Sequence, residues 1–135
     1  MTRVFVFEYV TGGGAASLDA TACAELLPAG LAMRDAVVAD LLALPGVQVG
    51  VAVEDAAPRL PTGAVPLHAQ PGEALPDFVA RMAASHDVAW VIAPESDGLL
   101  ERLATRTGAV AGASRWLGCD AAAIAVAAHK RLCLR

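Results

Sequence analysis

Residues 4–14 read VFVFEYVTGGG, a run of apolar, β-favouring side chains that ends in a charged residue and then in three consecutive glycines. A continuous apolar run without alternation is typical of a strand that is buried on both faces, as in a parallel sheet. The glycines break the strand and let the backbone approach a neighbouring group where a Cβ atom would obstruct it. The segment therefore predicts a buried parallel strand with a tight loop at its carboxyl end.

Strand and helix patterns alternate along the rest of the chain. Besides 4–7, we predict strands over residues 47–53, 65–68, 88–93 and 110–114. We predict helices over residues 28–44, 76–85, about 96–107, and from 121 toward 134. Residues 15–25 fit either a loop or a short helix.

The ends of the helices follow from residues that favour helix termini. Pro28 suits the first turn of the first helix. Ser96 or Asp97 is expected to cap the third helix, and Gly108 to end it. Asp120 is expected to cap the last helix.

This order of elements predicts an α/β fold. We expect a Rossmann-like, doubly wound, mostly parallel sheet of four to five strands with flanking helices, as a single domain over residues 1–135. Ligands of such sheets bind beyond the carboxyl ends of the strands. Candidate site residues therefore lie in three places: 8–14, 54–55 and 94–97.

The composition limits the classes of protein. The chain has 135 residues, of which 56% are hydrophobic, enough for one core and too many for a disordered chain. Acidic residues outnumber Lys and Arg by 14 to 10, and Lys130 is the single lysine, so we expect no nucleic-acid partner. No apolar run approaches the roughly 20 residues of a membrane span. The first residues do not have the pattern of a signal peptide, because Glu8 and Tyr9 interrupt the apolar run too early. We therefore expect a cytoplasmic protein with no membrane partner.

The cysteines and histidines show no disulfide or metal pattern. Cys23, Cys119 and Cys133 are widely spaced and lack a CxxC motif, so we expect reduced thiols. The three histidines add no zinc-ligand spacing, and no bound metal is expected.

The loop after the first strand is the first candidate for binding. A carboxylate such as Glu8 is costly after a buried strand unless it is solvated or paired, and at the strand end it can face a crevice. Thr11 adds a hydroxyl, and Gly12, Gly13 and Gly14 can present N–H groups to an anion. The alternative is a flexible turn with a solvated Glu8.

A dinucleotide site is a second interpretation of the same loop. Gly12 and Gly14 begin a G-x-G-x-x pattern, and Glu54 follows the second strand, where a ribose-binding acid would lie. Ser17, however, stands in place of the third glycine, and the strong helical pattern begins well after the loop.

Charged residues elsewhere offer further candidates. Ser96 and Asp97 are explained as helix caps, whereas Glu95 could bind an ammonium or amine of a ligand. Arg34 either extends along apolar surface to water or clamps an anion in the crevice. Lys130, near the C-terminus, either complements a helix dipole or contacts a phosphate. No complete nucleophilic or metal-dependent active site is visible, so we expect no catalytic residues.

Several segments together resemble the N-terminal, pre-ATP-grasp domain of a group of ATP-grasp ligases. They are FVFEYVTGGG at 5–14, LPAGLAM at 27–33, VIAPESDGLL at 91–100 and the stretch 124–130. The group includes tyramine–glutamate ligase-like enzymes of methanofuran biosynthesis. The last stretch resembles the handover to the ATP-grasp domain, although His129 stands where the family usually has Asp.

The resemblance implies a ligase that forms an acyl phosphate and then an amide from a carboxylate and an amine. ATP and magnesium would be held mainly by later domains, so the isolated domain is expected to bind no cofactor. Glu8, residues 11–14 and Glu95 would bind the small-molecule substrate, and Lys130 would lie near the nucleotide phosphates. The chain stops at Arg135, before an ATP-grasp domain, and we expect that domain as its partner and no catalysis without it.

The alternative function is a free-standing, non-catalytic binding or assembly module. An apolar surface on the final helix, with Ile124, Leu132 and Leu134 partly bared, would favour a homo-oligomer. A dinucleotide-binding domain is a third alternative, which titration with nicotinamide cofactors would test.

Overall fold

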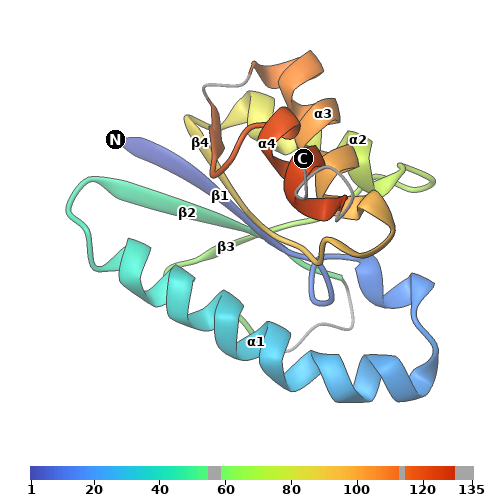
Figure 1. Ribbon diagram of the computed structural model, residues 1–135. Helices are drawn as coiled ribbons and strands as arrows, with labels where there is room; N and C mark the ends of the chain where they lie inside the picture. Colours follow the sequence, from blue (N-terminus) through green and yellow to red (C-terminus); the bar gives the residue numbers. More distant parts are fainter. Residues whose placement is uncertain (55–58, 113–114, 130–135) are drawn as a thin grey trace.

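The computed structural model describes residues 1–54, 59–112 and 115–129 (Figure 1). Strands and helices alternate along these residues. The strands are β1 (Thr2–Glu8), β2 (Val47–Ala52), β3 (Val65–Leu67), β4 (Val88–Ile92) and β5 (Trp116–Leu117). The helices are α1 (Ala20–Leu42), α2 (Leu75–Ser85), α3 (Leu99–Ala111) and α4 (Ala121–Ala128), with short 3-10 helices η1 (Gly14–Ser17) and η2 (Ser96–Gly98).

The five strands form one parallel sheet in the order β3-β2-β1-β4-β5. The chain winds outward from β1 to β2 and β3, and then crosses to β4 and β5 on the other side. The predicted α/β fold class is therefore confirmed, with β1 at the centre. The switch in winding direction lies between β1 and β4, where the carboxyl ends of doubly wound sheets bind ligands.

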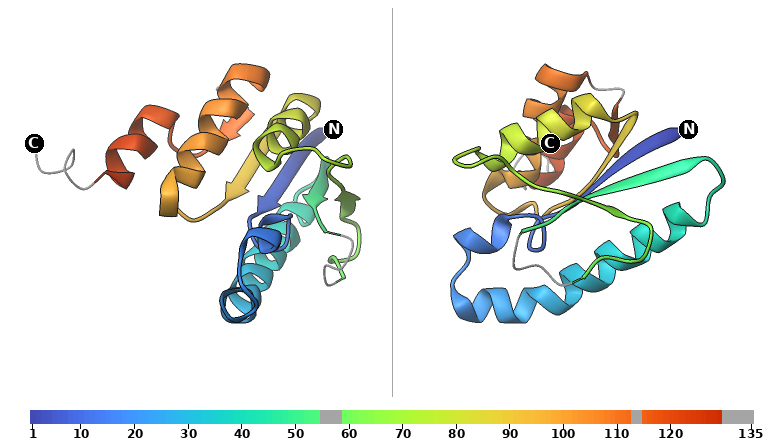
Figure 2. Two further views of the ribbon diagram at one scale, coloured as in Figure 1. Left: turned by 90° about the vertical axis from the view of Figure 1, so that its right-hand side faces the viewer. Right: turned by 180° about the vertical axis from the view of Figure 1, so that it is seen from behind.

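Helices cover both faces of the sheet (Figures 1 and 2). One face packs on α1, where Val4 and Val6 of β1 meet Val38 in one apolar cluster. The other face packs on α2 and α3. There the rings of Phe5 and Phe78 meet edge to face, with 6.1 Å between their centroids. Alternate residues of β1 thus enter two separate cores, as the unbroken apolar run predicts.

The first helix begins two turns earlier than predicted. Asp19 caps α1 by accepting a hydrogen bond from the Ala22 backbone N–H at 2.8 Å, so residues 20–27 are helical and Pro28 lies inside the helix. Proline removes one helical hydrogen bond and leaves the Ala24 carbonyl without its usual donor. Both residues are exposed, so water can hydrate that carbonyl.

The predicted caps of the third helix are wrong. Neither Ser96 nor Asp97 caps α3, because both belong to η2, and the N-cap is Gly98 with a left-handed φ of 66°. Gly108 does not end the helix either; α3 continues to Ala111.

The last strand is displaced from the predicted 110–114. Residues 110 and 111 are the final turn of α3, which ends at Gly112 with φ 84°, and β5 follows at Trp116–Leu117. A positive φ suits a glycine that ends a helix. Gly112 therefore supplies the stop that the sequence prediction placed at Gly108.

For the last helix, the predicted cap is confirmed, but the predicted exposure of Ile124 is not. Asp120 caps α4 by accepting from the Ala123 N–H at 2.8 Å. Ile124 is only 5% exposed, because α4 packs on α3, so the expected exposure of this residue is wrong.

Leu132, Leu134 and Cys133 lie outside the described residues, and Cys23 and Cys119 are free thiols. No helix in the described part of the chain has the length and apolarity needed to cross a membrane.

Candidate functional site

Two pockets flank the carboxyl end of β1. The first, which we call the polar pocket, has a volume of about 330 Å3 and lies beside the ends of β2 and β3. It is lined by Gly12, Gly13, Val53, Glu54, His68, Ala69, Glu73 and Leu75. The second, the apolar pocket, has a volume of about 270 Å3 and lies between the ends of β1 and β4 and helix α1. It is lined by Glu8, Tyr9, Val10, Leu26, Ala29, Gly30, Met33, Ile92, Ala93 and Pro94.

The Glu8 side chain organises the loop that separates the two pockets. Its carboxylate oxygens accept hydrogen bonds from the backbone N–H groups of Val10 and Thr11, at 3.1 and 2.9 Å. The side chain is buried against α1: a Cβ atom on Gly30 would lie 2.8 Å from Glu8 Oε2. Glu8 is only 3% exposed, so the alternative of a solvated carboxylate in a flexible turn is wrong.

The glycine loop directs most of its N–H groups inward. Gly12 donates to the Glu8 carbonyl at 2.8 Å, and Gly14 donates to the Tyr9 carbonyl at 2.7 Å. Together with the two donors to the Glu8 carboxylate, four of the N–H groups between residues 10 and 14 have acceptors within the loop. The loop is therefore a poor cradle for an anion, which needs several N–H groups pointing outward.

The glycines are needed for the shape of the loop. Gly13 has a φ of 125°, a conformation that other residues rarely adopt. A Cβ atom on Gly14 would lie 2.3 Å from the Tyr9 ring. The Tyr9 hydroxyl in turn lies 2.6 Å from Ser17 Oγ, which donates to the Gly14 carbonyl at 2.8 Å. The predicted binding residues Thr11, Gly12 and Gly14 are buried, and Gly12 and Gly13 line the polar pocket.

The apolar pocket brings together three of the four segments that carry the resemblance, 5–14, 27–33 and 91–100. The Tyr9 N–H donates to the Ile92 carbonyl at 2.9 Å, which joins the end of β1 to the end of β4. Leu26 and Met33 of α1, each 46% exposed, lie at this pocket. Glu95 follows the lining residue Pro94 and is exposed, with no partner among the described residues.

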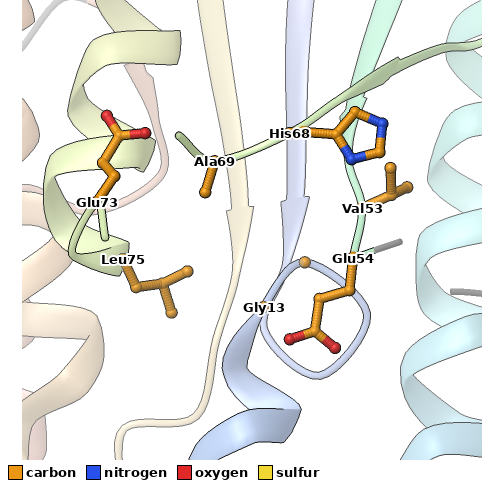
Figure 3. Close-up of a pocket in the computed structure, with 8 residues that line it drawn as sticks. Gly13, Val53, Glu54, His68, Ala69, Glu73 and Leu75 are labelled. Carbon is orange, nitrogen blue, oxygen red and sulfur yellow. The ribbon is translucent and has the colours of Figure 1, made fainter. Parts of the chain in front are cut away.

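Glu54 and Glu73 are the two carboxylates of the polar pocket (Figure 3). The Glu54 N–H donates to the Thr11 carbonyl at 3.2 Å, which fixes the end of β2 against the loop. The sequence prediction included residues 54–55 at a strand end but missed Glu73 and His68. These two come after the short strand β3, in a segment with no periodic pattern to mark them. Asp55 lies outside the described residues.

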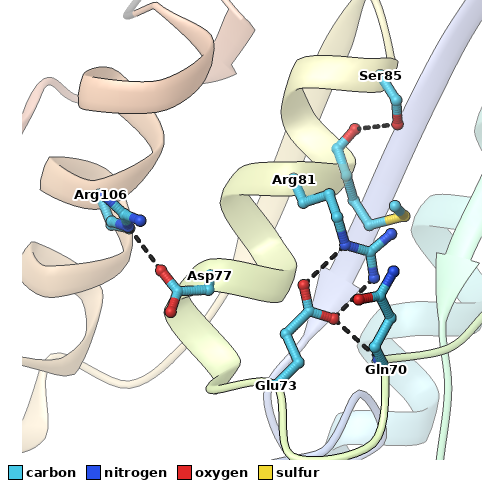
Figure 4. Close-up of polar contacts among 7 residues, drawn as sticks. Gln70, Glu73, Asp77, Arg81, Ser85 and Arg106 are labelled. Atoms are coloured by element: carbon cyan, nitrogen blue, oxygen red, sulfur yellow. Dashed lines mark hydrogen bonds and ion pairs between the residues drawn. The ribbon is translucent and has the colours of Figure 1, made fainter.

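Arg81 of α2 neutralises Glu73 (Figure 4). Arg81 Nε and Nη2 each donate to a Glu73 oxygen at 2.7 Å, and the Gln70 N–H donates at 2.8 Å. The hydrogen bonds from Arg81 lower the pKa of Glu73 from its ordinary 4.5 to about 2. The same pair raises the pKa of Arg81. Glu73 therefore stays ionised and paired at neutral pH.

We predict that Glu73→Gln lowers the free energy of unfolding by about 1 kcal/mol at neutral pH, a value discounted for solvent screening. Because the folded-state pKa is depressed, the pair stabilises fully above pH 4.5, and this stabilisation is lost as the pH falls through about 2. Urea unfolding of both proteins across this range should show their difference shrinking with acid. Asp77→Asn breaks the half-exposed pair with Arg106 and is the control, with a smaller effect. A difference that stays constant down to pH 2 would contradict the prediction.

Arg34 is fully buried and lines neither pocket. Its guanidinium donates to the Asp35 carboxylate at 2.8 Å and to the Arg59 carbonyl at 3.4 Å, while Nη1 has no partner among the described residues. Both sequence interpretations, extension to water and an anion clamp in the crevice, are therefore wrong. The side chain instead ties α1 to the segment after β2.

The described residues form no evident site for a nucleotide or magnesium, which the resemblance places mainly in later domains. The loop N–H groups are used internally, and Asp19 occupies the N-terminus of α1, where a phosphate would need free N–H groups. Within residues 1–54, 59–112 and 115–129, no three His, Cys, Asp or Glu side chains could hold a metal ion. The same geometry counts against a dinucleotide site. Lys130 lies outside the described residues, so its phosphate contact stays a prediction.

Comparison with known proteins identifies the family. Residues 47–124, more than half of the chain and spanning β2 to α4, match the pre-ATP-grasp 3 domain. A comparison with curated proteins and one with solved structures gave no match. The observed all-parallel sheet with flanking helices is consistent with this match. This chain belongs to the pre-ATP-grasp 3 domain family.

Proposed function

We propose that this chain is the substrate-side, N-terminal part of an ATP-dependent ligase of the acyl-phosphate type, which joins a carboxylate to an amine. The match over residues 47–124 carries this proposal, because a pre-ATP-grasp domain usually pairs with an ATP-grasp domain. The two pockets at the carboxyl edge support it, since this edge is where α/β sheets bind their ligands. ATP and magnesium would be held by the ATP-grasp domain.

We further propose that the carboxylate and the amine belong to methanofuran-type cofactor biosynthesis, as in tyramine–glutamate ligase-like enzymes. The support for this finer assignment is the similarity of residues 5–14 and 91–100 to those enzymes. Both segments end at the apolar pocket, where the Tyr9 N–H and the Ile92 carbonyl are hydrogen-bonded. Two segments far apart in the sequence, both similar to the same group of enzymes, thus line the same apolar pocket.

In the proposed ligase, this chain supplies walls and contacts rather than a reacting group. The Glu8 carboxylate holds the loop in place by accepting hydrogen bonds from the backbone N–H groups of Val10 and Thr11. We propose that Glu95, exposed beside the apolar pocket, contacts substrate directly. Lys130 is proposed to approach the nucleotide phosphates.

The test is ADP formation by this chain together with its ATP-grasp domain. We expect release that requires ATP, magnesium, a carboxylate and an amine together, with glutamate and tyramine as the first pair, and an amide product identified by mass spectrometry. ADP release that never depends on an amine would contradict the proposed ligase. Activity only with other pairs of carboxylate and amine would contradict the methanofuran assignment but would still support the proposed ligase activity.

Glu95→Ala is expected to raise the KM for substrate about tenfold, the cost of one charge-assisted hydrogen bond in a partly solvated site. The fold should not change, because Glu95 is exposed and has no partner among the described residues. Glu25→Ala, an exposed carboxylate on α1, serves as the matched control. Wild-type kinetics for Glu95→Ala would show that this residue has no role in the crevice.

The second candidate function is a non-catalytic binding or assembly module. The observation in its favour is the pair of half-exposed apolar side chains, Leu26 and Met33, on the first half of α1. Sedimentation of the chain alone separates the two functions. A stable dimer that a Met33→Ser substitution dissociates would support assembly, and a monomer would count against it.

A further inference from the structure

We infer that the polar pocket binds a positively charged group, a primary ammonium, in preference to carboxylates and phosphates. The inference rests on the proposed function only in assigning this ammonium to the amine substrate of the ligase. The selectivity for charge follows from the groups that line the pocket.

Glu54 supplies the charge that would attract the ammonium. Its carboxylate lies in the pocket beside Gly13 (Figure 3) and has no hydrogen-bond or ion-pair partner among the described residues. The residue is half-buried, so water screens its charge less than it screens a fully exposed carboxylate. A half-buried carboxylate without a partner is costly, and a bound ammonium would offset this cost through charge-assisted hydrogen bonds.

The backbone of the pocket gives an anion little to bind. In anion sites built from glycine loops, several successive N–H groups point at the ligand. Here the N–H groups of Thr11, Gly12 and Gly14 already donate to Glu8 and Tyr9. An anion beside Gly12 and Gly13 would therefore meet few donors and would lie close to Glu54.

The cation nearest to Glu73, Arg81, is already paired. Arg81 makes two hydrogen bonds of 2.7 Å to Glu73, so the pair has no net charge toward the pocket. Among the other carboxylates and arginines of the described lining, Glu54 is left with a formal negative charge that no arginine pairs. The formal charge of these groups at the pocket is therefore negative.

The volume of the pocket is consistent with a small ligand. The volume of about 330 Å3 is at the lower end of small-molecule pockets, so it suits a short amine or the amine end of a longer substrate.

The test uses three probes of similar size and different charge: butylammonium, butyrate and 1-butanol. Each is titrated into the 15N-labelled chain at constant ionic strength and about pH 8, where an ordinary histidine is neutral. We expect butylammonium alone to shift the amide resonances of Gly12, Gly13 and Glu54 in a saturable way. Glu54→Gln is expected to weaken this binding about tenfold or more, since it removes the charge of the acceptor.

Glu25→Gln is the matched control, because it removes the same charge from an exposed position on α1 and should leave the titration unchanged. Unchanged binding by Glu54→Gln would overturn the inference. So would equal shifts from 1-butanol, stronger shifts from butyrate or phosphate, or no saturable shift from butylammonium.

The outcome is independent of the ligase assay, because no ATP or second domain is present. Failure of ammonium binding alongside amine-dependent ADP release would remove the pocket assignment alone. Ammonium binding without ligase activity would leave a cation-binding domain with a different function.

Discussion

Replacing Gly14 by alanine is expected to destabilise the fold by about 3 kcal/mol, the upper range of overpacking in a closed site. A Cβ atom at this position would lie 2.3 Å from the Tyr9 ring and 2.5 Å from the Tyr9 carbonyl oxygen. The ring is held by the hydrogen bond between its hydroxyl and Ser17, and the carbonyl accepts from the Gly14 N–H itself. Neither contact can be relieved by turning the end of a flexible side chain. Urea unfolding followed by circular dichroism measures the loss.

Gly108→Ala is the matched control for that substitution. Gly108 lies inside α3, and a Cβ atom there would meet no atom within 4 Å. Alanine has the higher helix propensity, so the expected change is a gain of about 0.5–1 kcal/mol. Two substitutions of identical chemistry should therefore change stability in opposite directions. Similar stabilities for the two variants would mean that the loop is not packed as described.

Glu8→Ala is expected to lower the free energy of unfolding by about 3 kcal/mol. The substitution removes the acceptors of two N–H groups, those of Val10 and Thr11, in a buried site. Each unsatisfied buried donor costs about 1–3 kcal/mol, and part of this is recovered because the buried charge is also removed. Thermal and urea unfolding at neutral pH test the value.

Glu95→Ala provides the contrast, since the family resemblance implies the same substrate-binding role for Glu8 and Glu95. Glu95 is exposed and has no partner among the described residues, so its substitution should change stability by less than about 0.5 kcal/mol. Equal effects for the two residues would show that the Glu8 hydrogen bonds contribute little to the fold.

The fold could be predicted from the sequence because its strongest signals are periodic. The apolar run of 4–7 requires a strand with both faces covered, and the alternation of strands and helices then leaves few arrangements. The helix boundaries were less predictable, because they depend on groups whose conformation is set locally. Pro28 is tolerated inside α1 on its exposed side, and α3 passes Gly108 to end at Gly112, where φ is positive.

The candidate site could be predicted as a location and only in part as a set of residues. The rule that strand ends bind ligands directs attention to residues 8–14, and the structure places this loop between two pockets. The direction of its N–H groups could not be predicted, because it depends on the Glu8 carboxylate turning back beneath the loop. Glu73 was missed because its importance comes from Arg81, eight residues away and on α2.

The hydrogen bonds within the loop also lower the entropic cost of binding a ligand at the carboxyl edge of the sheet. A loop that orders only when its ligand arrives gives up conformational freedom at that moment, which weakens the affinity. Here the Glu8 carboxylate and the Tyr9 carbonyl already hold Val10, Thr11 and Gly14 in place. The edge therefore offers a preorganised surface, and any closure that shields a bound ligand from water falls to segments other than this loop.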